Sequence, residues 1–308
     1  MGLVRFETLP DFNDGDYGFD DTDPRGPWQM VPLGGPKYLR LKVVGTTVAS
    51  IESDNPGIAS VTSAEKEIGY KSVYRFDGKA KGPASIYVRG SQREVLARLQ
   101  IEVKSLRNPF VQFFLVSDKT GRRTTTTMKD VWTWMESANR MIFSPQINVT
   151  FTLKSVQDVK VEMDLGDPID FGSIGMMPFV EKVTPAEKKW HAITDRGALG
   201  REVFNVFCVW DFVHSSDSEQ FDAFVASKTR ITAEEMERSG ANYNMCIIKD
   251  KAGGGIVPEW MVYAHEAGHY LEGFPFHYEG RKGFYPLMRG DGLLGARLLR
   301  RDAEKMNP

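Results

Sequence analysis

The chain has 308 residues, of which 41% are hydrophobic and 26% charged, a composition typical of a globular protein with one large domain or two ordinary ones. Its formal net charge of −2 provides no global attraction to nucleic acid or to an anionic membrane surface. No stretch approaches the roughly 18 apolar residues that a membrane-spanning helix needs, so we expect neither a nucleic-acid partner nor a transmembrane segment.

Residues 1–36 are rich in Asp, Gly and Pro and show almost no hydrophobic periodicity, so we expect an acidic N-terminal strap. The first residues lack the basic start, apolar run and cleavage site of a signal peptide. This favours either a cytoplasmic protein or export by a route that needs no such signal. DFNDGD, at 11–16, has closely spaced carboxylates but not the register of a calcium loop, and we interpret it as a solvated acidic loop.

Residues 37–105 contain short runs of strand character separated by turn sequences. The runs are YLRLKVV, IASV, SVYRFDG, ASIYVRG and LARLQIEV, and the turns include SDNPG, DGKAKGP and RGSQ. This spacing predicts a small all-β sandwich. The order SDNPGIASV, FDGKAKGPASIYV, LQIEVKS resembles bacterial Ig-like domains, which implies a spacer or adhesive module without site residues.

Residues 106–308 predict an α+β domain. PFVQFFLV is a strand, and a Thr-rich cap opens a helix through VWTWMESANRMI; INVTFTLKSVQDVKV, EVFNVFCVWDFV and NMCIIKD are further strands. We expect the helix to bury Val131, Trp134, Met135, Ala138 and Met141 or Ile142. Cys208 and Cys246 lie in apolar runs, where a cysteine is usually a small buried hydrophobe.

The chemistry is concentrated in a final predicted helix, PEWMVYAHEAGHYLEG, which we expect to begin near Pro258 and stop at Gly273. His265 and His269 are four residues apart, so both imidazoles project from one helix face and can supply two ligands to Zn²⁺. Glu266 can reach a metal-activated water without ligating the metal, as the general base of a zinc peptidase does.

A catalytic zinc site needs a third protein ligand and an open position. His277 is the preferred candidate, because it follows the expected helix stop through the turn GFPF and imidazole is the commonest ligand type. Glu272, Glu279 and Asp291 are the alternatives.

HEAGHYLEGFPFH followed by YPLMRGDG resembles the metzincin superfamily of zinc peptidases, whose pattern is H-E-x-x-H-x-x-G-x-x-H with a downstream Met-turn. The resemblance covers roughly residues 108–308. It implies His265, His269 and His277 as ligands, Glu266 as base and Met288 as the Met-turn residue. It also implies that the strand NMCIIKD binds substrate by edge pairing. The sequence departs from the family where His277 falls two positions late and where no Tyr follows Met288 by two residues.

The resulting hypothesis is a zinc-dependent endopeptidase that acts on a protein or peptide substrate, and a secreted bacterial effector or toxin is a narrower version of it. The alternative is a catalytically degenerate binding or adhesive protein that retains a zinc site. A further hypothesis makes the strap inhibitory, with Asp14 or Asp16 bound to the metal. We expect no catalytic role for His214, and the sequence leaves the oligomeric state open.

Overall fold

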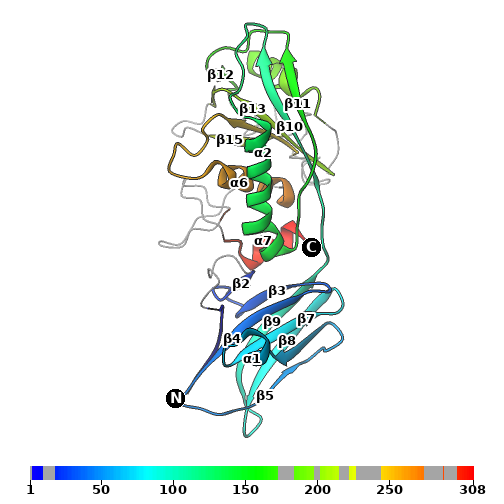
Figure 1. Cartoon of the computed structure of the whole chain (residues 1–308), viewed down its shortest axis with the longest axis vertical. Helices are drawn as coiled ribbons and strands as arrows, with labels where there is room; N and C mark the ends of the chain where they lie inside the picture. Colours follow the sequence, from blue (N-terminus) through cyan, green and yellow to red (C-terminus); the bar gives the residue numbers. More distant parts are fainter. Residues whose placement is uncertain are drawn as a thin grey trace. The chain divides into compact units, whose positions relative to one another are not determined.

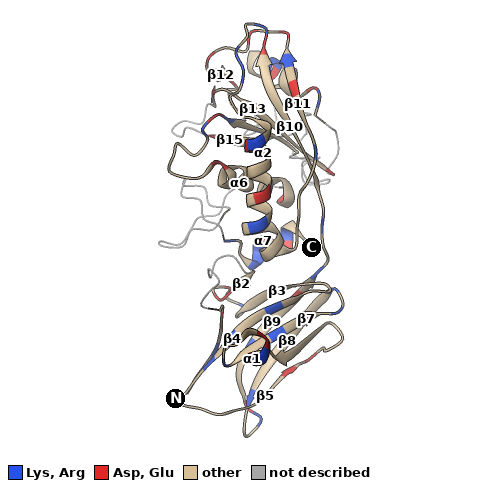
Figure 2. Cartoon of the chain, in the orientation of Figure 1, with Lys and Arg blue, Asp and Glu red and all other residues tan. Residues whose placement is uncertain are grey.

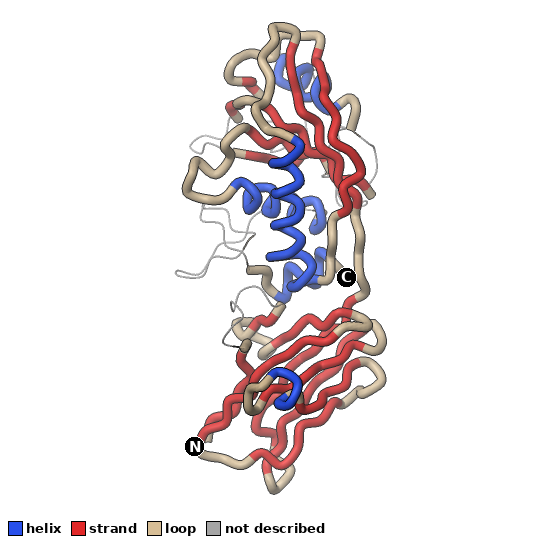
Figure 3. Tube along the Cα trace, viewed as in Figure 1, coloured by secondary structure: helices blue, strands red, loops and turns tan. Residues whose placement is uncertain are grey.

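The computed structural model of the chain describes residues 2–9, 18–172, 184–197, 202–214, 222–226, 244–273, 287 and 297–308. The fold is a multi-sheet α+β architecture in which the described residues form more strands than helices (Figure 3). The chain divides into two compact units. The first unit comprises residues 1–107, 140–150 and 296–308, and the second comprises 108–139 and 151–295. Acidic and basic residues are interspersed along both units (Figure 2).

The first unit contains two sheets (Figure 1). One is antiparallel with the strand order β1-β4-β7-β6. The other has the order β2-β3-β9-β8-β5, and its β3–β9 pair is parallel. The strands are β1 (Leu3–Glu7), β2 (Phe19–Asp20), β3 (Trp28–Pro32), β4 (Pro36–Val44), β5 (Val48–Ser53), β6 (Ala59–Ser63), β7 (Val73–Gly78), β8 (Gly82–Gly90) and β9 (Val95–Lys104), and α1 (Glu65–Ile68) is a single helical turn.

A shared core lies between these two sheets. Along β4 the buried residues alternate with more exposed ones, which is the period-two pattern of a strand with one buried face. Leu39 and Leu41 from β4 and Phe76 from β7 meet side chains of the second sheet in one cluster. The strands predicted within 37–105 are all present.

Residues 1–36, expected to form an acidic strap, contribute strands to both sheets where the structure describes them. There, β1 pairs with β4, and β3 pairs with β9. The strands are short and flanked by Asp, Gly and Pro, which hides their periodicity in the sequence. Asp14 and Asp16 lie outside the described residues.

Two later segments complete the first unit, so the predicted boundary at 105/106 does not enclose it. A π-helical turn (Asn139–Phe143) leads into α3 (Ser144–Ile147), and α7 (Arg300–Met306) lies near the end of the chain. The main-chain N–H of Leu298 donates to Gln146 Oε1 at 2.7 Å, and Asn307 Nδ2 donates to the Ile147 carbonyl at 2.8 Å. These bonds join the two segments to each other.

Residues 147–151 do not form the strand that their alternation predicts. Asn148 has φ 54 and caps α3 in the left-handed conformation, which asparagine tolerates better than most residues. Its side-chain amide donates to the Lys104 carbonyl at 2.8 Å. This local bonding competes with strand geometry, and the strand begins only at Thr152.

The second unit contains a five-stranded sheet with the order β11-β10-β13-β16-β15. Every neighbouring pair is parallel except β15–β16. The elements are β10 (Phe110–Asp118), α2 (Met128–Ala138), β11 (Thr152–Val161), β12 (Ile169–Asp170), α4 (Pro185–Thr194), β13 (Val203–Val209), β14 (Phe212–Val213), β15 (Ala223–Ala226), β16 (Met245–Lys249) and α6 (Glu259–Glu272). β12 and β14 form a small separate parallel pair.

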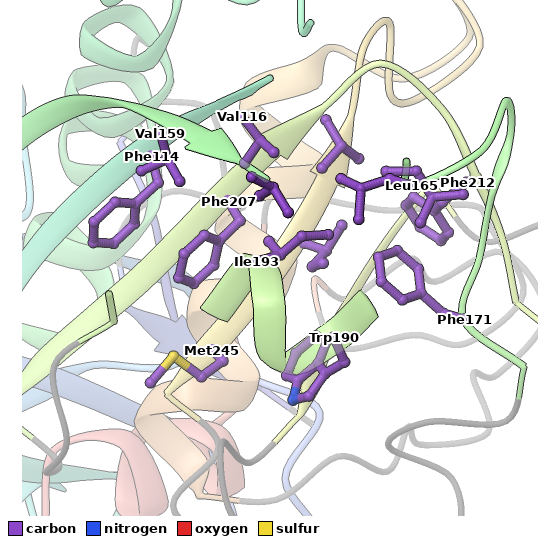
Figure 4. Close-up of a cluster of buried hydrophobic side chains, with 14 of the residues drawn as sticks. Phe114, Val116, Val159, Leu165, Phe171, Trp190, Ile193, Phe207, Phe212 and Met245 are labelled. Carbon is purple, nitrogen blue, oxygen red and sulfur yellow. The ribbon is translucent and has the colours of Figure 1, made fainter. Parts of the chain in front are cut away.

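Helices cover both faces of this sheet, which explains why every residue of β13 is buried. Phe114 and Phe207 stack at 4.5 Å on the face covered by α4, where Trp190 and Ile193 join them (Figure 4). The neighbouring residue Phe113 points to the other face and meets α6.

Helix α2 begins with a capping box between Thr127 and Asp130, as the Thr-rich entry predicts. It buries the predicted stripe of Val131, Trp134, Met135 and Ala138, and this face packs against α6 (Figure 1). Both cysteines are buried and free, in agreement with the interpretation as small hydrophobes. None of the helices within the described ranges is long and apolar enough to span a membrane.

Candidate metal centre

Helix α6 carries the candidate metal-binding residues. It begins at Glu259 directly after Pro258 and ends at Gly273, whose φ of 66 lies in the left-handed region. The Gly273 N–H donates to the His269 carbonyl at 2.9 Å, closing the last turn. Both predicted ends are confirmed. The helix is buried from Val262 to Leu271, as expected of a helix held against a sheet.

Two tyrosines one heptad apart fix the rotation of α6. Tyr263 packs on Phe113 of β10 with ring centroids 5.6 Å apart, and Tyr270 stacks on Phe204 of β13 at 4.8 Å. At about 100° per residue, His265 and His269 lie roughly 200–240° around the helix from Tyr263. The imidazoles therefore point away from the aromatic contact with the sheet.

The two histidines converge on one point. Their Nε2 atoms are 3.2 Å apart, and the ring planes are nearly perpendicular at 84°. Two nitrogens bound to one tetrahedral zinc, each about 2.0–2.1 Å from it, are about 3.3 Å apart. The same separation also allows an N–H···N hydrogen bond between the rings. The separation of the two nitrogens is thus close to the one that two zinc ligands have.

A backbone carbonyl orients the first of these rings. His265 Nδ1 lies 2.7 Å from the carbonyl oxygen of Leu287. Because a carbonyl only accepts, Nδ1 carries the proton, and the Nε2 of the neutral ring keeps its lone pair. That tautomer is the one a metal ligand needs, and such outer contacts typically orient ligating histidines. The sequence offered no signal for this acceptor, since it belongs to the main chain.

Glu266 lies beside the pair and is 95% buried. Its Oε2 has no hydrogen-bond partner within the described part of the chain. Burial raises the pKa of this carboxyl to about 8. Its position on the helix turns it partly towards the sheet. Burial raises the pKa of the Cys246 thiol on β16, and the Glu266 carboxylate adds to that rise. A buried carboxyl on the same helix as two neighbouring imidazoles is a set of side chains whose chemistry suits zinc and water.

The structure does not describe the residue that the sequence favours as third ligand. No group of three or more His, Cys, Asp or Glu that could hold a metal occurs among the described residues, so Glu272 does not complete the pair. His277, Glu279 and Asp291 fall outside the described residues, and so does Met288. Leu287, which directly precedes Met288 in the chain, is described. Its side chain is fully buried, and its carbonyl accepts the hydrogen bond from His265.

His214 lies on the opposite face of the sheet. Its ring packs on Phe224 of β15 at 4.8 Å, and Phe224 belongs to the cluster covered by α4. His191 is exposed on α4. Neither histidine belongs to the candidate metal centre.

No protein-family model matches this chain, and no curated protein matches it. Among solved structures, domains 5–6 of the S-layer protein SbsC align at 21% identity over 24% of this chain and 38% of that one, with a TM-score of 0.20. Domains 4 and 5 of SbsC align at 20% identity over 24% and 45%, with a TM-score of 0.19. A chaperone–substrate complex aligns at 9% identity over 76% and 37%, with a TM-score of 0.34. The chain spans less than half the length of each of these structures, and TM-scores this low assign neither fold nor function.

The strand predicted to pair with substrate occupies an interior position. NMCIIKD forms β16, which is bonded on one side to β13 and on the other to β15. Both edges of β16 are therefore used, and edge pairing by this strand is excluded. Among the described strands, β15 is the last on that side of the sheet, and α6 packs against it.

Proposed function

We propose that this chain is a zinc-dependent endopeptidase with its centre on α6. The observation that carries the proposal is the 3.2 Å separation of the His265 and His269 Nε2 atoms, on the same helix as the buried Glu266 carboxyl, whose Oε2 has no hydrogen-bond partner among the described residues. A lone pentapeptide can occur by chance on a surface helix. A buried helix with converging rings and an outer carbonyl on one of them is harder to explain without a metal.

In this proposal His265 and His269 hold the metal, and His277 is the third ligand. Zinc in such a site acts as a Lewis acid and lowers the pKa of water towards neutrality. Glu266 takes a proton from the water that attacks the scissile carbonyl carbon, and it returns that proton to the amine as the C–N bond breaks. Because Glu266 is buried, solvent screens its electrostatic interaction with the attacking water and with the leaving amine only weakly.

The substrate-binding edge is assigned to β15 rather than β16. Among the described strands, none pairs with the outer side of β15, and an extended peptide bonded there would run near α6, which packs against β15. The metzincin resemblance of residues 108–308, with Met288 in a turn below the metal, is part of the proposal. So is the Ig-like character of the first unit, which is supported by its two sheets around one core.

The test uses the purified full chain and a library of unfolded proteins and peptides. We expect about one zinc per chain, hydrolysis that a chelator abolishes and zinc restores, and a loss of turnover of at least 100-fold in Glu266→Gln with zinc retained. Full activity in Glu266→Gln would sink the assignment. Stoichiometric zinc with no hydrolysis of any peptide would favour the degenerate binding protein instead.

A further inference from the structure

Residues 251–257, between β16 and α6, form a tightly bonded loop. The N–H of Gly254 donates to the Lys251 carbonyl at 3.2 Å, and the N–H of Ile256 donates to the Gly253 carbonyl at 2.9 Å. Gly253, Gly254 and Gly255 all have φ between 55 and 89, a region that other residues rarely adopt. A Cβ on Gly253 would lie 2.1 Å from the Val257 carbonyl oxygen. The three glycines therefore permit this loop shape, and the hydrogen bonds hold it.

The tip of this loop presents an aliphatic side chain to solvent. Ile256 is 84% exposed, the largest exposed fraction among the large hydrophobic residues that the structure describes, and the next is Met128 at 58%. Single exposed hydrophobic residues are common on protein surfaces. Ile256 differs because it stands on a turn in which its own N–H and that of Val257 both donate to the Gly253 carbonyl, at 2.9 and 3.1 Å, so the side chain is presented from a hydrogen-bonded position.

The loop is attached to the start of the edge strand. Asp222, the residue before β15, accepts from the Gly253 N–H at 2.8 Å. The other carboxylate oxygen of Asp222 lies 2.8 Å from Lys249 Nζ at the end of β16. In the antiparallel β15–β16 register, Ala223 is opposite Ile248, so the loop leaves the sheet beside the first residue of β15. Ile256 thus stands near one end of the edge assigned to substrate.

We propose that Ile256 is a specificity-determining residue that contacts an apolar side chain of the substrate several residues from the scissile bond. The inference rests on the proposed function, and it narrows the substrate class to extended polypeptide segments with an aliphatic or aromatic residue at that position. A peptide bonded to β15 and running past Ala223 reaches the loop after leaving the strand. Ile256 supplies apolar contact there but no polar or charged group, so it selects by burial.

The experiment compares cleavage of a peptide library by the full-length parent chain, Ile256→Ser and Ile256→Leu, with sites and rates read by mass spectrometry. The parent should favour an apolar residue at one position away from the scissile bond. In Ile256→Ser, kcat/KM for those peptides should fall about 10-fold, mainly through KM, while peptides with Ala there are cleaved as before. Ile256→Leu should retain the preference.

Val95→Ser is the matched control, because Val95 is 52% exposed on β9 in the first unit. It should leave the cleavage profile unchanged, and none of the three variants should lower the thermal unfolding midpoint. If the parent is active and Ile256→Ser has the same cleavage profile and the same rates, the inference is overturned while the proposed peptidase function stands. A zinc-loaded parent that cleaves no peptide would instead overturn the proposed function, and the inference with it.

Discussion

The indole N–H of Trp134 donates to a carboxylate oxygen of Glu259 at 3.2 Å and thereby joins α2 to the first turn of α6. Both groups are partly or fully removed from water, so the bond is shielded from competing solvent. It fixes the end of α6 from which the two candidate ligands follow within about three turns.

Replacing Trp134 by Phe should lower the free energy of unfolding by about 1–2 kcal/mol, because Glu259 loses a donor while the ring contact is largely kept. Chemical denaturation of the full chain measures the change. Trp132→Phe on the same helix is the control, since Trp132 is 44% exposed. Equal effects of the two substitutions would contradict a role for the bond.

His269→Ala should reduce zinc affinity by at least 100-fold, because one of two converging ligands is removed. Metal analysis after dialysis against a graded zinc buffer measures this. His214→Ala should keep the parent's affinity, since His214 packs on Phe224 on the far face of the sheet. Unchanged zinc binding in His269→Ala would remove α6 as the metal-binding element.

Asp250 anchors the Thr-rich entry of α2 to the end of β16. Its carboxylate accepts from the Thr125 N–H at 2.7 Å and from the Thr126 hydroxyl at 3.1 Å, among other donors in the same stretch. Asp250→Ala should cost about 2–3 kcal/mol of unfolding free energy, because several donors lose one acceptor. Asp158→Ala is the control, with a side chain that is 82% exposed. If Asp250→Ala unfolds at as high a denaturant concentration as Asp158→Ala, Asp250 does not anchor the entry of α2.

Asp302 makes the stability of the first unit depend on pH. Burial raises the pKa of its carboxyl from 3.8 to about 6, although the Leu299 N–H donates to it. Between about pH 4 and 6 the folded chain therefore binds more protons here than the unfolded chain, and unfolding free energy falls as pH rises. The total loss should be up to about 3 kcal/mol, at about 1.4 kcal/mol per pH unit.

Hydrogen exchange of first-unit amides at pH 4.5 and 7 measures this dependence. The parent should be less protected against global opening at pH 7 after correction for intrinsic exchange, and Asp302→Asn should show a smaller difference. If the protection of the parent and of Asp302→Asn changes equally with pH, groups other than Asp302 cause the pH dependence.

The sequence predicted the elements whose patterns are strong and local. The all-buried β13, the capped α2 with its stripe at Val131 and Trp134, and the α6 stop at Gly273 follow from hydrophobic runs, a Thr cap and a glycine. Convergence of His265 and His269 follows from helix periodicity alone.

Features set by distant partners were not predictable. β16 has the composition of any buried strand, and its interior position depends on β15, a four-residue strand without a clear pattern. Asn148 ends a helical turn because its side chain reaches the Lys104 carbonyl, forty-four residues away in the chain. The Leu287 carbonyl has no side-chain signature at all. Local periodicity does not carry information of this kind.

The first unit is built from three separate segments of the chain, so its parts are made at different times during synthesis. Its two sheets are complete once about 105 residues have emerged, but α7 and Asn307 are made only after the whole second unit. The Asn307 amide donates to the carbonyls of Ser105 and Ile147, so these hydrogen bonds form only after all three segments of the first unit have been made. A chain that stops before Arg300 lacks these bonds, and we expect its first unit to be less stable than that of the full chain.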